Sequence, residues 1–143
     1  MADKHSKEKR SYNMSQVKSK ETKPEVLVRK HLFANGFRYR KNDKRLPGNP
    51  DIVLPKYKTV VFVNGCFWHQ HENCKYAALP ETNKEFWQEK LLSNKRRDKE
   101  KLKQLETLGW RVIVVWTCEL KLKVRQDRLE RLFEEIKEAE DYD

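Results

Sequence analysis

The segment WRVIVVWT, residues 110–117, constrains the fold more than any other stretch of the chain. Its residues are nearly all apolar or β-branched, so neither face of the strand that it forms can be turned to water. We therefore expect a central strand with other elements packed on both faces. A chain of 143 residues is long enough for one domain with a single core around such a strand.

Two further apolar runs, 51–55 and 59–63, are separated by only three residues and predict a β-hairpin. Before them, residues 23–37 predict a helix that has Pro24 in its first turn and ends at Gly36. Between this helix and the hairpin, the segment FRYR predicts the start of a short strand.

A long helix is predicted over about residues 83–108, with a capping box of Thr82 and Glu85 at its start and Gly109 at its end. An amphipathic helix follows the apolar strand, and its apolar face carries Leu129, Leu132, Phe133 and Ile136. The order helix, hairpin, helix, strand, helix predicts an α/β domain with a small mixed β-sheet flanked by helices.

Positive charge is concentrated in two parts of the chain. Residues 1–46 carry 14 Lys and Arg against 5 Asp and Glu, and residues 93–125 carry 10 against 4. Residues 47–92 are balanced, with 5 of each sign, and residues 126–143 are acidic. Two basic blocks around a neutral middle indicate a polyanion such as nucleic acid, although solvated lysine-rich helices would give the same pattern.

The N-terminal residues 1–12 are polar and show no periodicity, so they are expected to form a disordered basic arm before a single domain of residues 13–143. They lack the apolar core of a signal peptide, and the chain has no run of about 18 apolar residues that could span a bilayer. These features predict a cytoplasmic protein that makes no contact with a membrane.

The three cysteines, together with one histidine, form a candidate zinc site. Cys66, His71, Cys74 and Cys118 are three thiols and an imidazole, which suit a closed tetrahedral Zn²⁺ site that stabilises the fold and leaves no position for substrate. The spacing equally allows His69 to bind the metal in place of His71. Without a metal, Cys118 would be a buried core thiol and Cys66 a residue at the end of a strand.

Three other side chains could support hydrolysis. Asp51 begins the first strand of the hairpin, where a carboxylate can hold Mg²⁺, although an aspartate after GNP is also common in turns. Glu25 lies in the first turn of the first helix and is a candidate second carboxylate, or a residue that only complements the helix dipole. His69 is the third, because a histidine side chain can act as a general acid or base in phosphodiester hydrolysis.

Phe67 and Trp68 lie between a candidate metal ligand and polar histidines. Large apolar side chains on a loop that a metal braces, next to basic surface, suit insertion between the base steps of duplex DNA. The alternative is that one ring belongs to the core and the other covers the metal.

Five segments closely resemble the very short patch repair endonucleases, the Vsr family: NMSQVKSKETKPE (13–25), LPGNPDIVLP (46–55), FVNGCFWH (62–69), TNKEFWQEKLLSNKRRD (82–98) and GWRVIVVWTCEL (109–120). The resemblance covers about residues 10–125. It implies a variant of the PD-(D/E)xK restriction-endonuclease fold. It also implies a Mg²⁺-dependent nickase that cuts duplex DNA 5′ to the thymine of a T·G mismatch arising from deamination of 5-methylcytosine.

The resemblance also implies roles for particular residues. Asp51 would bind Mg²⁺ together with the backbone carbonyl of Val63, while His69 and Glu25 would act on the waters around the metal. The positions that intercalate beside the mismatch are Met14, Phe67 and Trp68, and those that contact the mismatched pair are Lys90 and Asn94. The protein would act as a monomer on DNA, with other DNA repair proteins as further partners.

The sequence departs from the family pattern at three points. Asn64 stands where the family usually has histidine, so this residue either only orients water or reduces the activity. Thr117 stands where glutamate is common, and two residues separate His71 from Cys74 where some relatives have one. Two other functions therefore stay open: a related nuclease that cuts without a mismatch, and a zinc-stabilised DNA-binding module with weakened catalysis.

Overall fold

The hairpin predicted from the sequence forms the middle of a four-stranded sheet in the computed structural model, which describes residues 23–138. Strands β2 (Ile52–Leu54) and β3 (Thr59–Asn64) are antiparallel, and the short strand β1 (Arg40–Lys41) pairs with β2 on its other side. Strand β4 (Arg111–Trp116) runs parallel to β3. The sheet is therefore mixed, in the order β1-β2-β3-β4, which confirms the predicted α/β class.

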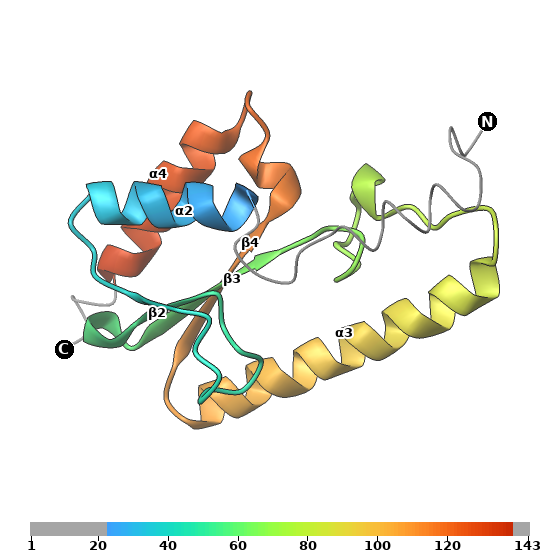
Figure 1. The fold of residues 1–143 in the computed structure, drawn as a ribbon, viewed down its shortest axis with the longest axis horizontal. Coiled ribbons are helices and arrows are strands. Elements are labelled where there is room, and N and C mark those ends of the chain that lie inside the picture. Colours follow the sequence, from blue (N-terminus) through green and yellow to red (C-terminus); the bar gives the residue numbers. More distant parts are fainter. Residues whose placement is uncertain (1–22, 139–143) are drawn as a thin grey trace.

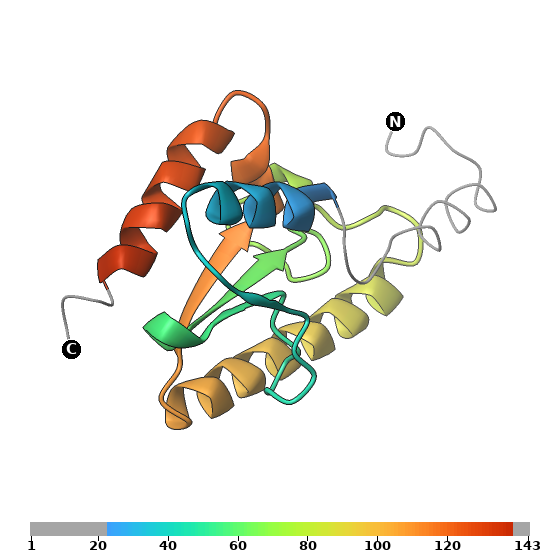
Figure 2. The ribbon, with the colours of Figure 1, turned by 60° about the vertical axis from the view of Figure 1, so that its left-hand side comes forward.

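Helices cover both faces of this sheet. Helices α2 (Lys23–Ala34) and α4 (Arg125–Glu138) pack on one face and the long helix α3 (Lys84–Thr107) on the other (Figures 1 and 2). Alternate residues of β3 follow this division, because Val61 packs with α2 and α4 while Val60 packs with Leu105 of α3. The N-terminal part of α3 extends well beyond the sheet (Figure 1).

The prediction of a central strand at residues 110–117 is wrong in one respect. Strand β4 pairs only with β3 and so lies at an edge of the sheet. It is apolar because helices cover both of its faces: Ile113 and Val115 belong to the core under α2 and α4, and Val112 packs on the α3 side. At its open edge the guanidinium of Arg128 donates a hydrogen bond to the carbonyl of Val114, which protects the edge from further pairing.

The predicted capping box of Thr82 and Glu85 is also wrong. Asn83 is the N-cap of α3, adopts a left-handed conformation with a φ of 56°, and makes no side-chain capping hydrogen bond. The end of the helix agrees with the prediction, because Gly109 follows it with a φ of 89° that glycine adopts without strain. Among the described residues, no helix is both long and apolar enough to cross a membrane.

The topology brings several loops together at one end of the strands of the sheet. Since β3 and β4 are parallel, both end there, and Asp51 lies there too because the antiparallel strand β2 begins beside the end of β3. The loop after β3 contains a short 3-10 helix, η2 (Lys75–Ala77), and β4 leads directly into η3 (Thr117–Leu120).

Candidate active site and metal centre

Asp51 lies beside the C-terminal residues of strand β3. Its carboxylate oxygen Oδ2 accepts a hydrogen bond of 2.6 Å from the backbone N–H of Val63. This contact across the hairpin fixes the carboxylate next to the Val63 peptide at the edge of the sheet. Asp51 and Val63, the two residues expected to hold Mg²⁺, are therefore neighbours.

Glu25 and His69 lie close enough to Asp51 for their charges to act on it. The pKa of Asp51 is raised to about 7, mainly by burial and also by the nearby carboxylate of Glu25, against the lowering effects of the Val63 hydrogen bond, His69 and Arg29. Glu25 is only 3% exposed and forms a 3.5 Å ion pair with Arg29 inside α2. The structure thus brings Glu25 and His69, which are far from Asp51 in the sequence, close to the partly buried carboxylate of Asp51.

His69 has a partner that the sequence did not reveal. Its Nδ1 lies 2.6 Å from Oδ2 of Asp98, which comes from α3. Because an ionised carboxylate can only accept, Nδ1 carries the hydrogen and Nε2 is the nitrogen left to exchange a proton. Asp98 therefore orients the imidazole and selects its tautomer.

Asn64 is the last residue of β3 and lines a cavity of about 750 Å³ between the sheet edge, α3 and the loop after β3. His69 and Asp98 line the same cavity, together with the basic residues Lys95, Arg96 and Lys99 of α3. Asn64 thus lies on the same side as the histidine–aspartate pair, where its amide can form hydrogen bonds but cannot transfer a proton.

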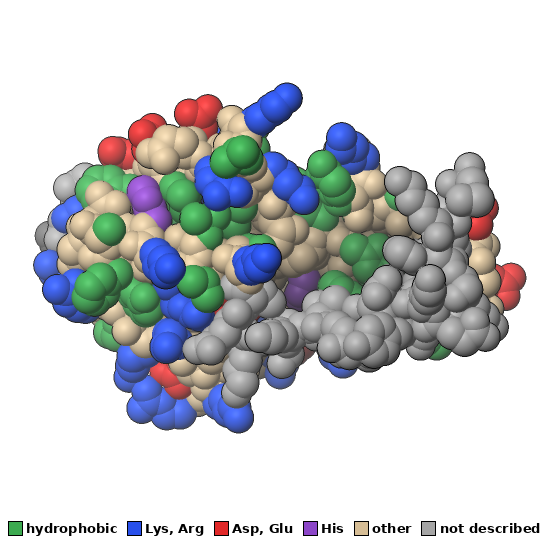
Figure 3. Space-filling model, turned by 45° about the horizontal axis from the view of Figure 1, so that its top comes forward, with side chains coloured by type: hydrophobic (Ala, Val, Ile, Leu, Met, Phe, Trp, Pro, Cys, Tyr) green, Lys and Arg blue, Asp and Glu red, His purple; other side chains and the backbone are tan. Residues whose placement is uncertain are grey.

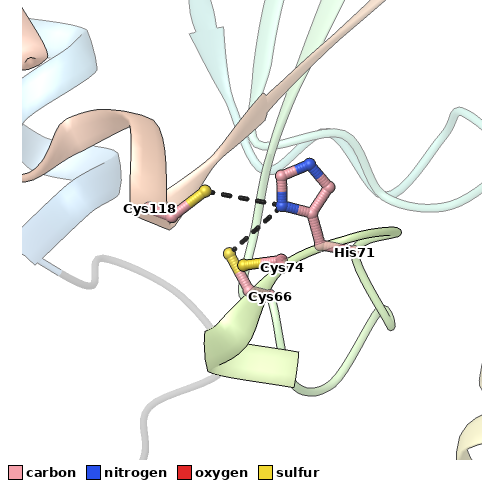
Figure 4. Close-up of side chains that lie close together, drawn as sticks. All are labelled: Cys66, His71, Cys74 and Cys118. Atoms are coloured by element: carbon pink, nitrogen blue, oxygen red, sulfur yellow. Dashed lines mark hydrogen bonds between the residues drawn. The ribbon is translucent and has the colours of Figure 1, made fainter. Parts of the chain in front are cut away.

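Cys66, His71, Cys74 and Cys118 converge in one cluster, with ligand atoms within 4.8 Å of one another (Figure 4). The Nδ1 atom of His71 lies 3.4 Å from the sulfur of Cys118 and 3.7 Å from that of Cys66. Zinc–sulfur bonds of about 2.3 Å place tetrahedral ligands roughly 3.8 Å apart, so the four side chains fit a metal ion. The fold brings His71, and not His69, into this cluster.

The electrostatics of this cluster also favour a cation. The pKa of Cys118 is raised to about 12, first by burial and then by the neighbouring thiols Cys66 and Cys74. Burial also opposes ionisation of Cys66, but hydrogen bonds with Thr117 and Cys118 outweigh it and lower its pKa. Without a cation the thiols compete for one negative charge, whereas a metal binds them all as thiolates.

Neighbouring residues fix the ligands of this cluster. The ring of His71 stacks on Trp116, with centroids 4.1 Å apart and the planes 8° from parallel. The hydroxyl of Thr117 accepts a 3.4 Å hydrogen bond from the backbone N–H of Cys66 and lies 3.5 Å from its sulfur. Thr117, one of the departures from the family pattern, thus supports a ligand directly.

Phe67 and Trp68 form an aromatic cluster with Trp87 of α3. The three ring centroids lie 5.2–5.8 Å apart in edge-to-face arrangements, and Phe86, which is 57% exposed, contacts Trp87. Phe67, Trp68 and Trp87 are half-buried and belong to neither core cluster of the sheet. The sequence does not predict that Trp87 belongs to this cluster, because its partners lie in a loop that is distant in the chain.

The α3 residues expected to contact the mismatched pair lie beside this aromatic cluster. Asn94 donates a 3.4 Å hydrogen bond to the carbonyl of Trp68 and accepts one from Arg97. Lys90 is exposed one helical turn earlier. Asn94 and Asp98 are also one turn apart, so one face of α3 holds both Trp68 and His69. The predicted contact residue Met14 and the predicted arm 1–12 lie outside the described residues.

Comparison with known proteins places the chain in a family. The family model described as DNA mismatch endonuclease Vsr matches residues 2–75. The type II nicking enzyme V.NmeAIP of Neisseria meningitidis serogroup A is 56% identical over 140 residues, covering 97% of this chain and 99% of that protein. The DNA mismatch endonuclease Vsr of Escherichia coli K12 is 42% identical over 121 residues, 85% of this chain and 77% of that protein.

The fold, the site and these relatives together define a DNA-cleaving hydrolase of the endonuclease class. The basic surface of α3 and the oriented His69 are consistent with that class. The chain belongs to the Vsr family of DNA mismatch endonucleases and related nicking enzymes.

Proposed function

We propose that this protein nicks duplex DNA on the 5′ side of the thymine in a T·G mismatch, by Mg²⁺-dependent hydrolysis on a fold of the restriction-endonuclease type. The observation that carries the proposal is the 2.6 Å contact between His69 and Asp98 beside the half-buried Asp51. Perturbed carboxyl groups and oriented histidines cluster at catalytic sites, whereas a protein that only binds DNA has no use for bringing both to one place.

Asp51 and the backbone carbonyl of Val63 are the groups that would hold Mg²⁺, which prefers oxygen ligands. The donor set fits, because burial and the nearby Glu25 disfavour the ionised form of Asp51, and a divalent cation would offset both effects. When bound, Mg²⁺ would polarise the scissile phosphate and activate water. The carboxylate of Glu25 would orient water molecules on the α2 side.

His69 would move the proton. With Nδ1 hydrogen-bonded to Asp98, its Nε2 can take a proton from the attacking water or give one to the leaving oxygen. Positioned acid–base groups of this kind contribute about 10²–10⁴-fold to a rate. Asp98 keeps the imidazole in one orientation, which lowers the cost of reaching the reactive geometry.

Phe67, Trp68 and Trp87 would form a wedge that enters the base stack, with Met14 from the N-terminal arm as a further inserting residue. A T·G pair is stacked less well than a matched pair, so insertion costs least at the mismatch. Lys90 and Asn94 would contact the mismatched bases. Zinc on the Cys66–His71–Cys74–Cys118 cluster would keep the loop that carries the wedge rigid.

The proposed function is tested by strand-labelled duplexes that differ only in T·G against C·G, incubated with and without Mg²⁺. The expected result is one nick, 5′ to the mismatched thymine, that requires Mg²⁺ and is absent from the C·G duplex. Nicking of both duplexes at one sequence would instead identify a nuclease that acts without a mismatch. Tight binding without nicking at any Mg²⁺ concentration would identify a binding module.

Asn64→His is expected to raise the single-turnover nicking rate by roughly tenfold, because an imidazole at this position can exchange a proton and an amide cannot. The gain should depend on pH and disappear as the new imidazole becomes protonated. Asn64→Gln, which keeps an amide, is the matched control and should show no gain. Equal rates for Asn64→His and wild type across pH would mean that the residue only orients water.

Trp68→Ala and Trp87→Ala are each expected to weaken binding to the T·G duplex by about tenfold or more, since stacking on a base is worth about 1–3 kcal/mol. Binding to the C·G duplex should change much less. Trp110→Ala is the control, because this half-buried ring packs near Val112 far from the loop and should lower stability without changing the preference. Loss of stability with an unchanged T·G preference would assign Trp68 and Trp87 a purely structural role.

A further inference from the structure

A groove on the outer face of α2 combines basic and apolar side chains outside the site described above. It has a volume of about 570 Å³ and lies between the first turns of α2, η3 and the start of α4. Its basic lining residues are Lys23, Lys30, Lys121 and Arg125. None of the described residues that line it is acidic. The groove is therefore suited to a polyanion.

These four cations are not neutralised by neighbours. Among residues 23–138 none of them forms an ion pair, and the buried Nε of Arg125 has no hydrogen-bond partner. Elsewhere on α4 the opposite holds, because Arg128 and Arg131 are both paired with Glu119. The charge of the groove is thus available to a ligand, while the charge a few residues further along the same helix is not.

The groove continues a basic track that begins at the loop carrying the aromatic cluster. In that loop, the ring of Tyr76 is 47% exposed and lies under the ammonium groups of Lys75 and Lys121, at 5.2 and 4.8 Å from its centroid. Lys121 then lines the groove, and Lys23 lies two residues from Glu25. On the face shown in Figure 3, Lys and Arg side chains surround apolar ones over the middle of the molecule, and acidic side chains lie towards the edges.

We propose that this groove binds the phosphate backbone of the duplex beside the cut, as a second contact outside the catalytic centre. The inference rests on the proposed function, since it assigns the place where one arm of the nicked duplex lies. Lys23, Lys30, Lys121 and Arg125 would contact phosphates, and apolar lining residues such as Leu122, which is 79% exposed, would pack against deoxyribose. The contact would be independent of sequence and would add affinity on one side of the mismatch only.

The test compares two groove variants, Lys121→Gln/Arg125→Gln and Lys23→Gln/Lys30→Gln, with wild type. The control is Lys56→Gln/Lys58→Gln, which removes the same charge at exposed positions outside the groove and outside both basic blocks. Binding to T·G and C·G duplexes is measured by fluorescence anisotropy without Mg²⁺, from about 50 to about 200 mM salt. Each duplex is used at full length and with either arm shortened to a few base pairs.

Each groove variant is expected to bind both full-length duplexes about tenfold more weakly, with the slope of log K against log salt reduced by about two. The T·G preference should not change. Shortening one particular arm should remove the difference from wild type, and shortening the other arm should not. The control pair should keep the wild-type slope.

The inference is overturned if the groove variants have the slope of the control pair, or if their loss is the same on every shortened duplex. Unchanged DNA binding, with loss of binding to an acidic peptide as probe, would make the groove a protein-docking site. Because nicking is not the readout, failure of wild type to cut the T·G duplex would reject the proposed function without deciding the role of the groove.

Discussion

Replacing Asp51 with asparagine is expected to reduce the single-turnover nicking rate at saturating Mg²⁺ by about 10³-fold or more. Asp51 is the carboxylate proposed to bind the catalytic cation, which contributes several kcal/mol of transition-state stabilisation, and each 1.4 kcal/mol corresponds to about a tenfold change in rate. Binding to the T·G duplex without Mg²⁺ should be retained, because the aromatic cluster and the basic surfaces are unchanged. Near-normal nicking by this variant would remove Asp51 from the mechanism.

The same substitution should stabilise the protein at neutral pH when Mg²⁺ is absent. Burial raises the pKa of Asp51 to about 7, above its ordinary value of 3.8, so the folded state holds this proton more tightly than the unfolded state. Its favourable contribution is complete below about pH 4 and is lost as the pH rises towards 7. The melting temperature of Asp51→Asn, relative to wild type, should therefore rise over this pH range. A variant that is less stable than wild type throughout would show that Asp51 supports the fold.

The core of the fold follows from local patterns, whereas strand order does not. The apolar run at β4 correctly indicates that both faces of the strand are covered, but an edge strand protected by helices and by Arg128 has the same composition as a central one. Likewise Thr82 and Glu85 have the spacing of a capping box, but the left-handed Asn83 begins the helix without one. The sequence pattern indicates that β4 is buried and that a helix begins near Thr82. The position of β4 in the sheet and the conformation at the start of α3 depend on tertiary contacts.

Some residues of the candidate site can be predicted from the sequence, and others cannot. Cys66, His71 and Cys74 are close in the sequence, so their spacing alone predicts a metal site. Asp98 and Trp87 lie in a charged helix where nothing local separates a functional side chain from a solvated one. Only the packing of α3 against the loop after β3 brings Asp98 to His69 and Trp87 to the wedge.

Under the proposed function, this packing would connect mismatch recognition to cleavage. Trp68 and His69 are adjacent in the chain, and α3 holds the first through Asn94 and the second through Asp98. The cysteine–histidine cluster holds the other side of the same loop through His71. Any change that loosens the cysteine–histidine cluster is therefore expected to affect the proposed wedge and His69 together.

Cys118→Ala is accordingly expected to lower stability by at least about 4 kcal/mol, or more than about 10 °C in melting temperature, and to abolish nicking at 37 °C. Cys118 comes from η3, and the other three residues of the cluster come from the loop after β3, so a metal bound here would join the ends of two neighbouring strands. Losing one of four ligands removes most of the binding free energy of zinc, which a structural site contributes directly to folding. Elemental analysis should find one zinc per wild-type chain and much less in the variant.

A chelator provides the decisive comparison. The chelator should lower the melting temperature of wild type to that of Cys118→Ala, and it should not change the melting temperature of the variant. Chelation and the substitution are expected to remove the same stabilisation, the one that the bound metal provides. Val115→Ala, a truncation in the buried core three residues earlier, is the matched control and should lose the same amount of stability with and without chelator. Metal-free wild type that keeps its melting temperature would show that the four side chains pack as ordinary residues. The rigid loop proposed to carry the wedge would then need another explanation.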